Sequence, residues 1–304
     1  MKNGKTVIIT GSAKGLGSNI ALLLAKEGHN IIINYFQSKN EAKLLGERLA
    51  KITSVKIIKG DVSKFQDTQT IIQKTIKEFG SVDILINNAG IMACPETRIN
   101  KEWESQFAVN QIGHFLLTRE LMNSMKRAKE SRLVSLSSSA HSISGIIWDD
   151  IHFKANPYDK WIAYGQSKTA SSLLAIEFNR LMNDHGGKGF AVHPGGIMTP
   201  LQRHLPIEEM VALGWVKEDG SPSDLAANFF KSTTQGASTS LWCATSPMLD
   251  SLGGVFCENC DIAERKVNLD ESMLRYFGAQ VPTVPLLMTQ HPSARTLKMQ
   301  ISER

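Results

Sequence analysis

The sequence has few of the features that mark membrane or secreted proteins. No apolar run reaches the roughly 18 residues that a membrane-spanning helix needs. A first strand is already predicted from Lys5 onward, which leaves no room for a signal peptide before it. The chain has only four cysteines in 304 residues, which favours a reducing compartment over a disulfide scaffold. We therefore expect a cytoplasmic protein without a membrane span.

Long runs of one charge sign and low-complexity segments are also missing. The formal net charge of +5 is modest and spread along the chain, so nucleic acid is not an expected partner. Hydrophobic residues make up 42% and charged residues 21%, a balance that argues against disorder. The length suits one large α/β domain or two small ones, and a homo-oligomer is left open.

One cysteine pair, Cys257 and Cys260, has the C-x-x-C spacing of metal and redox sites. A zinc site would need two more ligands, and no nearby Cys or His pair supplies them, so we expect no metal. The pair follows the apolar run Gly254-Val-Phe256, which predicts the end of a strand, whereas a redox dithiol usually begins a helix. We expect both thiols to be buried.

The pattern of apolar residues predicts strands alternating with helices. Strands are predicted at residues 6–10, 30–35, 55–59, 82–86, 133–136, 190–192 and 255–256, and helices at 16–27, 40–51, 67–79, 101–126 and 162–182. Alternation with crossovers of this length predicts a doubly wound parallel sheet covered on both faces. We expect one α/β domain over residues 1–263. Residues 264–304 are expected to form a C-terminal extension, because prolines interrupt its periodicity.

A glycine-rich turn joins the first predicted strand to the first helix. Gly11, Gly15 and Gly17 permit a tight turn and a close approach of the backbone to a pyrophosphate. The helix that follows offers unpaired N–H groups at the positive end of its dipole. The spacing is G-x-x-x-G-x-G and differs from the common dinucleotide fingerprint. Its place between strand and helix predicts a nucleotide site.

The end of the second predicted strand bears on the choice of nucleotide. A carboxylate there would bind the adenosine ribose and repel a 2′-phosphate. Residues 34–39 contain no acid, whereas Lys14 lies in the glycine turn, and Ser38 and Lys39 add possible donors. The cofactor is therefore predicted to be NADP(H) rather than NAD(H).

Tyr164 and Lys168 lie four residues apart at the start of the long predicted helix 162–182, so their side chains share one face. A phenol has a pKa of about 10 and is a poor base near neutrality. An ammonium one turn away favours the phenolate, and we expect it to lower that pKa. The pair would then exchange a proton with a substrate oxygen.

Seven motifs, in order along residues 5–260, resemble those of the short-chain dehydrogenase/reductase family, which has a Rossmann-type fold. They are the turn at Gly11, Gly15 and Gly17; Asp61-Val62; Asn87-Asn-Ala-Gly90; Asn110; Ser137-Ser138; Tyr164 with Lys168; and His193-Pro-Gly195. The resemblance implies an oxidoreductase that transfers a hydride between the nicotinamide of NADP(H) and an alcohol or carbonyl carbon.

The same resemblance implies a role for each matching residue. Tyr164 would be the acid/base, Ser138 would bond the substrate oxygen, and Lys168 would hold the nicotinamide ribose. Asn110 would fix a water that connects Lys168 to solvent. The cofactor would be bound by Gly11, Ser12, Lys14, Gly15, Leu16, Gly17, Ser38, Lys39, Asp61, Val62, Asn88, Ala89, Gly90, Gly195, Ile197 and Thr199, together with Tyr164 and Lys168.

The 26 residues from Ser138 to Tyr164 are about twice the usual spacing in the family, which resembles the retinol-dehydrogenase-like branch with its Ser-Ser-x-Ala-His motif and insertion. We expect His141 and His152, within this stretch, to make structural hydrogen bonds. Ten aromatic and apolar residues either line a site for a lipophilic alcohol, ketone or aldehyde or pack the fold itself: Trp148, Phe153, Tyr158, Trp161, Met198, Leu201, Leu205, Met210, Leu213 and Trp215.

Two other functions use the same residues. An NADP(H)-binding sensor or scaffold would need no turnover, although intact Ser138, Tyr164 and Lys168 count against it. An isomerase or dehydratase would use a transient hydride without net redox. If the protein is an oxidoreductase, its sequence does not distinguish between retinoid, steroid and simple aryl ketone substrates.

Overall fold

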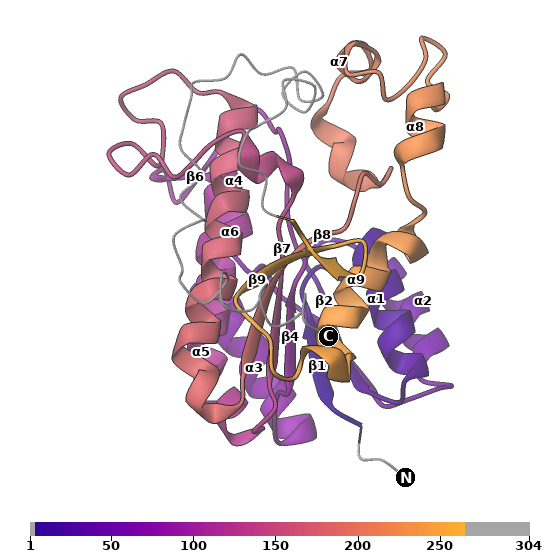
Figure 1. The fold of residues 1–304 in the computed structure, drawn as a ribbon, viewed down its shortest axis with the longest axis vertical. Helices are drawn as coiled ribbons and strands as arrows, with labels where there is room; N and C mark the ends of the chain where they lie inside the picture. The colour runs from indigo at the N-terminus through magenta and orange to yellow at the C-terminus, as the bar shows by residue number, and fades with distance from the viewer. Residues whose placement is uncertain (1–3, 265–304) are drawn as a thin grey trace.

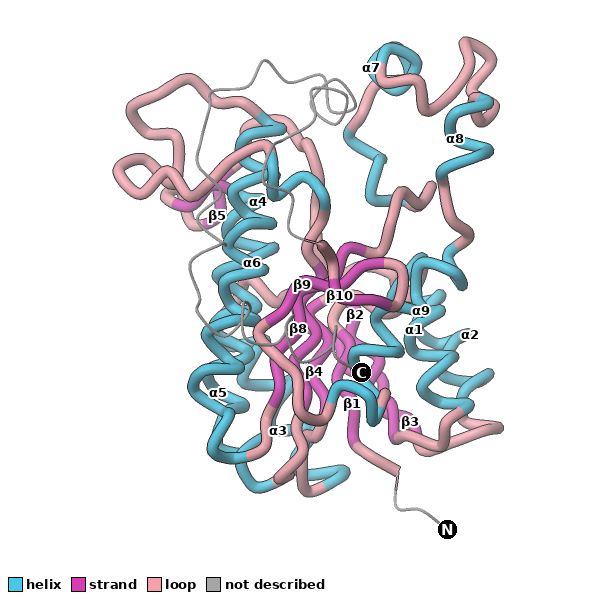
Figure 2. Tube along the Cα trace, in the orientation of Figure 1, coloured by secondary structure: helices cyan, strands magenta, loops and turns pink. Residues whose placement is uncertain are grey.

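In the computed structural model, which describes residues 4–264, an eight-stranded sheet runs through the centre of the molecule (Figures 1 and 2). Its order is β10-β9-β8-β7-β4-β1-β2-β3, and all neighbouring strands are parallel except β10 against β9. The strands are β1 (Thr6–Ile9), β2 (Asn30–Tyr35), β3 (Val55–Lys59), β4 (Ile84–Asn87), β7 (Arg132–Leu136), β8 (Lys188–His193), β9 (Val255–Glu258) and β10 (Asp261–Ile262). The predicted doubly wound parallel sheet is confirmed.

Helices cover both faces of this sheet, which explains why its central strands are continuous apolar runs. One face packs against α1 (Gly15–Lys26), α2 (Lys39–Leu49) and α9 (Thr233–Thr245). The other packs against α3 (Phe65–Phe79), α5 (Gly113–Arg127) and α6 (Lys160–Met182). Each face has its own apolar core, so the sheet is held as a rigid platform between two layers.

The strand order reverses between β1 and β4. The loops after these strands leave the carboxyl edge of the sheet toward opposite faces, which opens a crevice between them. In open α/β sheets of this kind, ligands bind at such a crevice. The topology therefore points to the edge where the glycine turn and the loop after β4 meet.

The helix predicted over residues 101–126 begins later than expected. Asn100 and Lys101 have positive φ angles of 54° and 66° and form the turn of a hairpin between β5 (Arg98–Ile99) and β6 (Trp103–Glu104). Helical structure starts only with α4 (Ser105–Phe107), where the Glu104 carboxylate caps the first N–H groups. A π-helical turn at Ala108–Ile112 then leads into α5.

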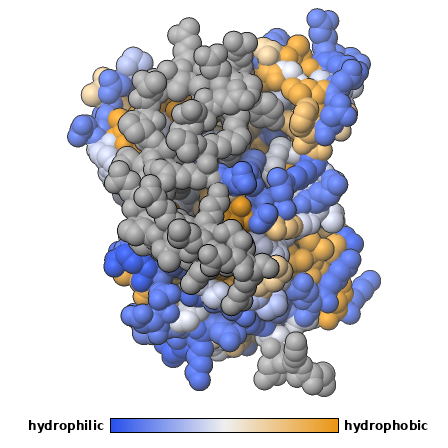
Figure 3. Space-filling model, viewed as in Figure 1, coloured by the Kyte–Doolittle hydropathy of each residue, from blue (hydrophilic) through white to orange (hydrophobic). Residues whose placement is uncertain are grey.

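Two segments rise above the carboxyl edge of the sheet (Figure 1). One is the insertion, residues 145–159, and the other is the flap, residues 196–231, which carries α7 (Ile207–Ala212) and α8 (Asp224–Phe229). The flap closes at its base, where the Lys231 N–H donates to the Gly196 carbonyl at 2.8 Å. Figure 3 shows apolar side chains around α7 and α8. Phe229, the last residue of α8, is 69% exposed.

The cysteine prediction is half right. Cys257 is buried in β9, but Cys260 is exposed, because it occupies the turn between β9 and β10 with a φ of 57°. No helix within residues 4–264 is both long and apolar enough to span a membrane. The C-terminal extension predicted for residues 264–304 lies outside the described residues, apart from residue 264.

Candidate active site

A cavity of about 960 Å³ opens at the carboxyl edge of the sheet. It brings together most of the site residues predicted from the sequence. The predicted residues that line it are Gly11, Lys14, Gly15, Leu16, Gly17, Ser38, Asp61, Val62, Asn88, Ala89, Gly90, Ser138, Tyr164, Lys168, Gly195, Ile197 and Thr199. Residues from both halves of the chain therefore meet around one space.

Three predicted residues do not line the cavity: Ser12, Lys39 and Asn110. The Ser12 hydroxyl is buried and donates to the Ile9 carbonyl at 2.8 Å, so it shapes the glycine turn from behind. Lys39 is the first residue of α2 and is exposed. Asn110 lies in the π-helical turn and acts on the loop after β4, as described below.

The glycine turn is shaped by close contacts and by backbone geometry. Gly11 and Gly15 have φ angles of 60° and 59°, a region that L side chains rarely adopt. A Cβ at Gly17 would lie 2.6 Å from the Asn88 side-chain nitrogen, so only glycine fits there. Lys14 precedes α1 without a side-chain hydrogen bond to the helix, and the first turn of α1 has no acidic residue. The first N–H groups of α1 are thus suited to an anion.

Asn34, at the end of β2, connects the glycine turn with the loop after β3 at the edge of the cavity. Its side-chain oxygen accepts from the Gly11 N–H at 3.1 Å, and its side-chain nitrogen donates to the Gly60 carbonyl at 3.0 Å. The residue is only 1% exposed. An aspartate at this position could not donate to the Gly60 carbonyl. Asn34 therefore has a structural role, in addition to lacking the negative charge of an aspartate.

A second buried link, between Thr10 and His114, was not found from the sequence. The Thr10 hydroxyl oxygen accepts from the Asn88 and Ala89 N–H groups, each at 2.9 Å. It lies 2.9 Å from His114 Nε2, while His114 Nδ1 lies 2.9 Å from the Asn110 carbonyl. A carbonyl only accepts, so Nδ1 carries the proton and Nε2 accepts from Thr10. Burial lowers the pKa of His114 to about 4, which keeps the ring neutral.

The Asn110 side chain holds the loop after β4 against α6. Its oxygen accepts from the Ile91 N–H at 2.9 Å, and its nitrogen donates to the Ile91 carbonyl at 3.0 Å and to the Ser167 hydroxyl at 2.9 Å. The π-helical turn presents this side chain inward at a point where a regular helix would place it differently. Asn110 thus positions the floor of the cavity from below.

Tyr164 and Lys168 enter the cavity from α6. The Asp159 carboxylate starts this helix by accepting from two N–H groups, each at 2.8 Å. Tyr164 is 4% exposed and Lys168 6% exposed. Lys168 Nζ donates to the Leu136 carbonyl at 3.0 Å and lies 5.5 Å from the centre of the Tyr164 ring.

The three serines after β7 have different surroundings. Ser137 is buried, and its hydroxyl donates to the Lys168 carbonyl at 2.9 Å. The Ser138 hydroxyl accepts from the Ala140 N–H at 3.1 Å and forms a hydrogen bond with Tyr164. The Ser139 N–H donates to His193 Nδ1 at 3.3 Å. Of the three serines, Ser138 is the one whose hydroxyl bonds the Tyr164 phenol.

The pKa values of the pair differ from the expectation. Burial raises the pKa of Tyr164 to about 12, with a smaller opposing effect from the Ser138 hydrogen bond. Burial also lowers the pKa of Lys168 to about 8. The pKa of Tyr164 is therefore raised where we expected it to be lowered, because desolvation by burial is the largest influence on it. At neutral pH the phenol is a proton donor.

The far end of the cavity is aromatic. Trp161 lies edge-on to Tyr164 at 6.4 Å between ring centres, and Trp215 continues the row at 6.3 Å from Trp161. Phe230 follows at 5.8 Å from Trp215. All four rings line the cavity, so an apolar wall extends from the phenol to the flap.

The other predicted wall residues are placed differently. Leu201 lines the cavity, whereas Leu205, Met210 and Leu213 belong to the apolar cluster that the flap forms with Tyr164 and Trp215. Trp148 and Met198 are exposed, and Phe153 packs edge-on against Tyr158 at 5.4 Å.

The predicted structural roles of the two histidines are confirmed. His141 Nδ1 lies 2.7 Å from the Ser138 carbonyl and donates to it. His152 Nδ1 accepts from the Glu104 N–H at 3.3 Å. Within residues 4–264, no group of three or more His, Cys, Asp or Glu side chains has the arrangement of a metal site.

Comparison with known proteins identifies the same family that the sequence motifs indicate. Residues 5–209 match the family described as short chain dehydrogenase. The chain is 34% identical over 263 residues to "Short-chain dehydrogenase/reductase prx1" of Penicillium roqueforti, covering 85% of this chain and 75% of that protein. It is 35% identical over 257 residues to "Probable oxidoreductase" of Streptomyces antibioticus, covering 84% and 85%.

A retinol dehydrogenase is also among the relatives. "Retinol dehydrogenase 12" of Mus musculus is 34% identical over 259 residues, covering 84% of this chain and 78% of that protein. Among solved structures, a blue fluorescent protein from a metagenomic library in complex with NADPH superposes with a TM-score of 0.66. It is 23% identical and covers 84% of this chain and 96% of that chain, which shows a shared fold.

Proposed function

Because the chain belongs to the short-chain dehydrogenase family, in its retinol-dehydrogenase-like branch, we propose that it is an NADP(H)-dependent oxidoreductase for a lipophilic ketone or aldehyde and the matching alcohol. The observation that carries this proposal is the arrangement of Tyr164. Its phenol is buried beside an apolar wall, is protonated at neutral pH, and has Ser138 and Lys168 as neighbours.

The shape and donors of the cavity fit a dinucleotide. The glycine turn and the start of α1 would hold the pyrophosphate, and Asp61 and Val62 would meet the adenine. The loop Asn88–Gly90 lines the cavity and would form the floor. Gly90 packs closely against Asn110, since a Cβ there would come within 3.2 Å of the Asn110 side-chain oxygen. Lys168 would hold the nicotinamide ribose, and Gly195, Ile197 and Thr199 would cover the nicotinamide end.

The adenosine end supports NADP(H) over NAD(H). Lys14 and Ser38 line it, and no carboxylate comes from the end of β2. The positive charge of Lys14 favours a 2′-phosphate. Arg203, which the sequence did not single out, also lines the cavity and is exposed.

The residues of the chain would handle the proton and the oxygen charge. Bound NADPH supplies the hydride to the carbonyl carbon. Tyr164 donates its phenolic proton to the substrate oxygen, and the Ser138 hydroxyl donates a hydrogen bond to the same oxygen as negative charge develops. The Lys168 ammonium stabilises the phenolate that remains. In alcohol oxidation the same groups act in reverse.

Tyr164→Phe tests this proposal, because it removes the hydroxyl and keeps the ring. General acid–base catalysis contributes about 10²–10⁴-fold, so kcat for NADPH-dependent ketone reduction should fall by that order. NADPH affinity, measured by fluorescence titration, should stay within a few-fold. Tyr35→Phe removes the same hydroxyl from another tyrosine of the cavity lining and controls for the loss of a phenol as such. At saturating NADPH its kcat should stay within a few-fold of wild type.

A panel of lipophilic ketones, followed at the reduced-nicotinamide wavelength, provides the substrates. NADPH binding without turnover of any ketone would favour a sensor or scaffold instead. If Tyr164→Phe retains more than about a tenth of wild-type kcat with chemistry rate-limiting, Tyr164 is not the acid/base.

A further inference from the structure

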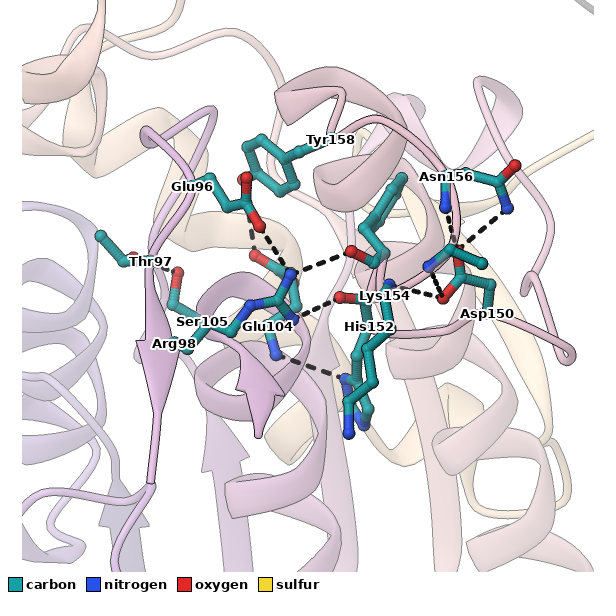
Figure 4. Close-up of polar contacts among 12 residues, drawn as sticks. Glu96, Thr97, Arg98, Glu104, Ser105, Asp150, His152, Lys154, Asn156 and Tyr158 are labelled. Carbon is teal, nitrogen blue, oxygen red and sulfur yellow. Dashed lines mark hydrogen bonds and ion pairs between the residues drawn. The ribbon is translucent and has the colours of Figure 1, made fainter. Parts of the chain in front are cut away.

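The insertion at residues 145–159 has no residue in the cavity lining, yet it is tightly bound to a segment that does line it. That segment is the β5–β6 hairpin together with the start of α4, where Ile99 of β5 and Ser105 of α4 line the cavity. Figure 4 shows the polar contacts that connect the two. The insertion can therefore influence the cavity through this hairpin. It also bonds Gln166 of α6 through Ile147 and Ile151, and the Cys94 carbonyl through Tyr158.

Arg98 makes the central contact. Its guanidinium donates to the His152 carbonyl at 2.5 Å and to the Phe153 carbonyl at 2.9 Å, and it pairs with the Glu96 carboxylate at 2.6 Å. The side chain is only 24% exposed. Phe153 has a φ of 49°, so the insertion adopts an unusual backbone conformation where Arg98 meets it. One side chain from the hairpin thus holds two consecutive carbonyls of the insertion.

A second set of contacts surrounds Glu104, which is fully buried. Its N–H donates to His152, while its carboxylate accepts from the Gln106 and Phe107 N–H groups at 2.8 and 2.7 Å. Gln106 Nε2 donates to the Tyr158 hydroxyl at 2.8 Å. These bonds join the end of the hairpin, the start of α4 and the end of the insertion.

The hairpin needs this support because β5 and β6 have only two residues each. An isolated two-stranded hairpin is marginally stable at best in water. The Thr97 hydroxyl donates to Ser105 at 2.7 Å and the Ser105 N–H to the Thr97 carbonyl at 3.1 Å, which closes the hairpin locally. Its position relative to the cavity depends on the contacts with the insertion.

At the rim, Lys154 of the insertion pairs with Glu102 of the hairpin. Both side chains are more than half exposed, and such ion pairs contribute little. Lys154 offers a matched control for Arg98, because both are cations that join the same two segments.

We propose that Arg98 is a specificity-determining positioning residue. It ties the insertion to the β5–β6 hairpin and so holds Ile99 and Ser105 where a bulky carbonyl substrate contacts the cavity wall. This inference rests on the proposed carbonyl reduction. A small ketone beside Tyr164 needs little of this wall, so the contact discriminates by substrate size.

The experiment compares Arg98→Ala, Arg98→Lys and Lys154→Ala with wild type, using benzophenone as the bulky ketone and 2-butanone as the small one. Arg98→Ala should lower kcat/KM for benzophenone about tenfold, mainly through KM, because a charge-assisted contact that orders the wall is lost. The value for 2-butanone should change less than about twofold, and NADPH affinity should not change. Arg98→Lys should be intermediate, since lysine lacks the planar fork, and Lys154→Ala should resemble wild type.

Amide hydrogen exchange provides a readout that does not depend on activity. In Arg98→Ala, exchange should increase in peptides spanning 93–109 and 145–160 and not in β1 or β4, while Lys154→Ala leaves both peptides protected. Equal losses for the two ketones, or unchanged exchange in these peptides, would overturn the inference. A wild-type protein that reduces neither ketone would count against the proposed function, and the exchange pattern would still decide whether Arg98 holds the wall.

Discussion

The two ends of the cavity are built from different interactions. Under the cofactor end, Thr10, Asn34 and His114 are at most 2% exposed, and each is committed to directional hydrogen bonds with backbone groups. At the substrate end the wall consists of aromatic rings, short helices and exposed side chains such as Phe229 and Leu225. Directional hydrogen bonds set the shape of the cofactor end, whereas apolar packing sets the shape of the substrate end.

This difference has consequences for substitution. A buried polar group that loses its partner costs about 1–3 kcal/mol, because nothing else can satisfy it. Apolar contacts are non-directional and can rearrange around a change of shape. We therefore expect abrupt effects at the cofactor end and graded effects, dependent on the substrate, at the other end.

The largest effect should come from Lys168→Ala, because Lys168 belongs to both ends. The substitution removes the group that stabilises the Tyr164 phenolate and the proposed contact with the nicotinamide ribose. We expect kcat to fall by about 10²–10⁴-fold and NADPH affinity to weaken as well. Steady-state kinetics and fluorescence titration measure the two, with exposed Lys51→Ala as control. A loss of kcat with unchanged NADPH affinity would place Lys168 at the tyrosine alone.

Next, His114→Leu should test the buried network directly. The Thr10 hydroxyl and the Asn110 carbonyl would both lose a partner, so the free energy of unfolding should fall by about 1–3 kcal/mol. NADPH affinity should fall too, because the Thr10 hydroxyl orients the Asn88–Ala89 N–H groups. His204→Leu, in the flap, should change stability little. Denaturant unfolding would contradict the comparison if the two variants lost equal stability.

Lys14→Glu should have a smaller effect that is confined to cofactor choice. One charge-assisted contact is worth roughly 1.5–3 kcal/mol, so the ratio of kcat/KM for NADPH over NADH should fall about tenfold or more. Lys39→Glu makes the same change of charge at a residue that does not line the cavity, and it should alter the ratio less. Equal ratios in wild type and Lys14→Glu would remove Lys14 from the site.

The most gradual effect concerns pH. Tyr164, with its pKa raised to about 12, stays protonated well above neutrality, but Lys168, with its pKa lowered to about 8, loses its charge first. Loss of the Lys168 charge above about pH 8 should slow ketone reduction. Alcohol oxidation, which needs the phenolate, should gain rate as the pH rises toward the pKa of Tyr164, although the same loss of charge should make that gain smaller. Parallel profiles in both directions, with chemistry rate-limiting, would contradict this assignment.

Lys168 should also make folding stability depend on pH above about pH 8. Between about pH 8 and 10.5 the unfolded chain holds a proton on Lys168 that the folded protein has released, so folding stability should rise with pH there. Thermal unfolding of wild type against Lys168→Met isolates this contribution. A difference in melting temperature that does not change with pH would show that Lys168 titrates normally.

Much of the platform could be predicted from the sequence. Apolar runs and helical periodicity depend on nearby residues, so the strand series, the parallel sheet and the glycine turn followed from local signals. Tyr164 and Lys168 share a helix face for the same reason. The prediction placed the start of the helix over residues 101–126 too early. The sequence alone did not distinguish the hairpin turn at Asn100 and Lys101 from the first turn of a helix.

Contacts between distant residues were decided only by the tertiary structure. No local pattern connects Thr10 with His114, or Arg98 with residues 152 and 153, because these pairs meet only when the sheet and its loops have assembled. Burial likewise reversed the expected pKa of Tyr164 and left Cys260 exposed. The sequence alone determined which residues can perform the chemistry, because residue type and spacing are local. Their protonation, their fixed orientation and the wall opposite them depend on what surrounds each side chain, and only the folded chain supplies those surroundings.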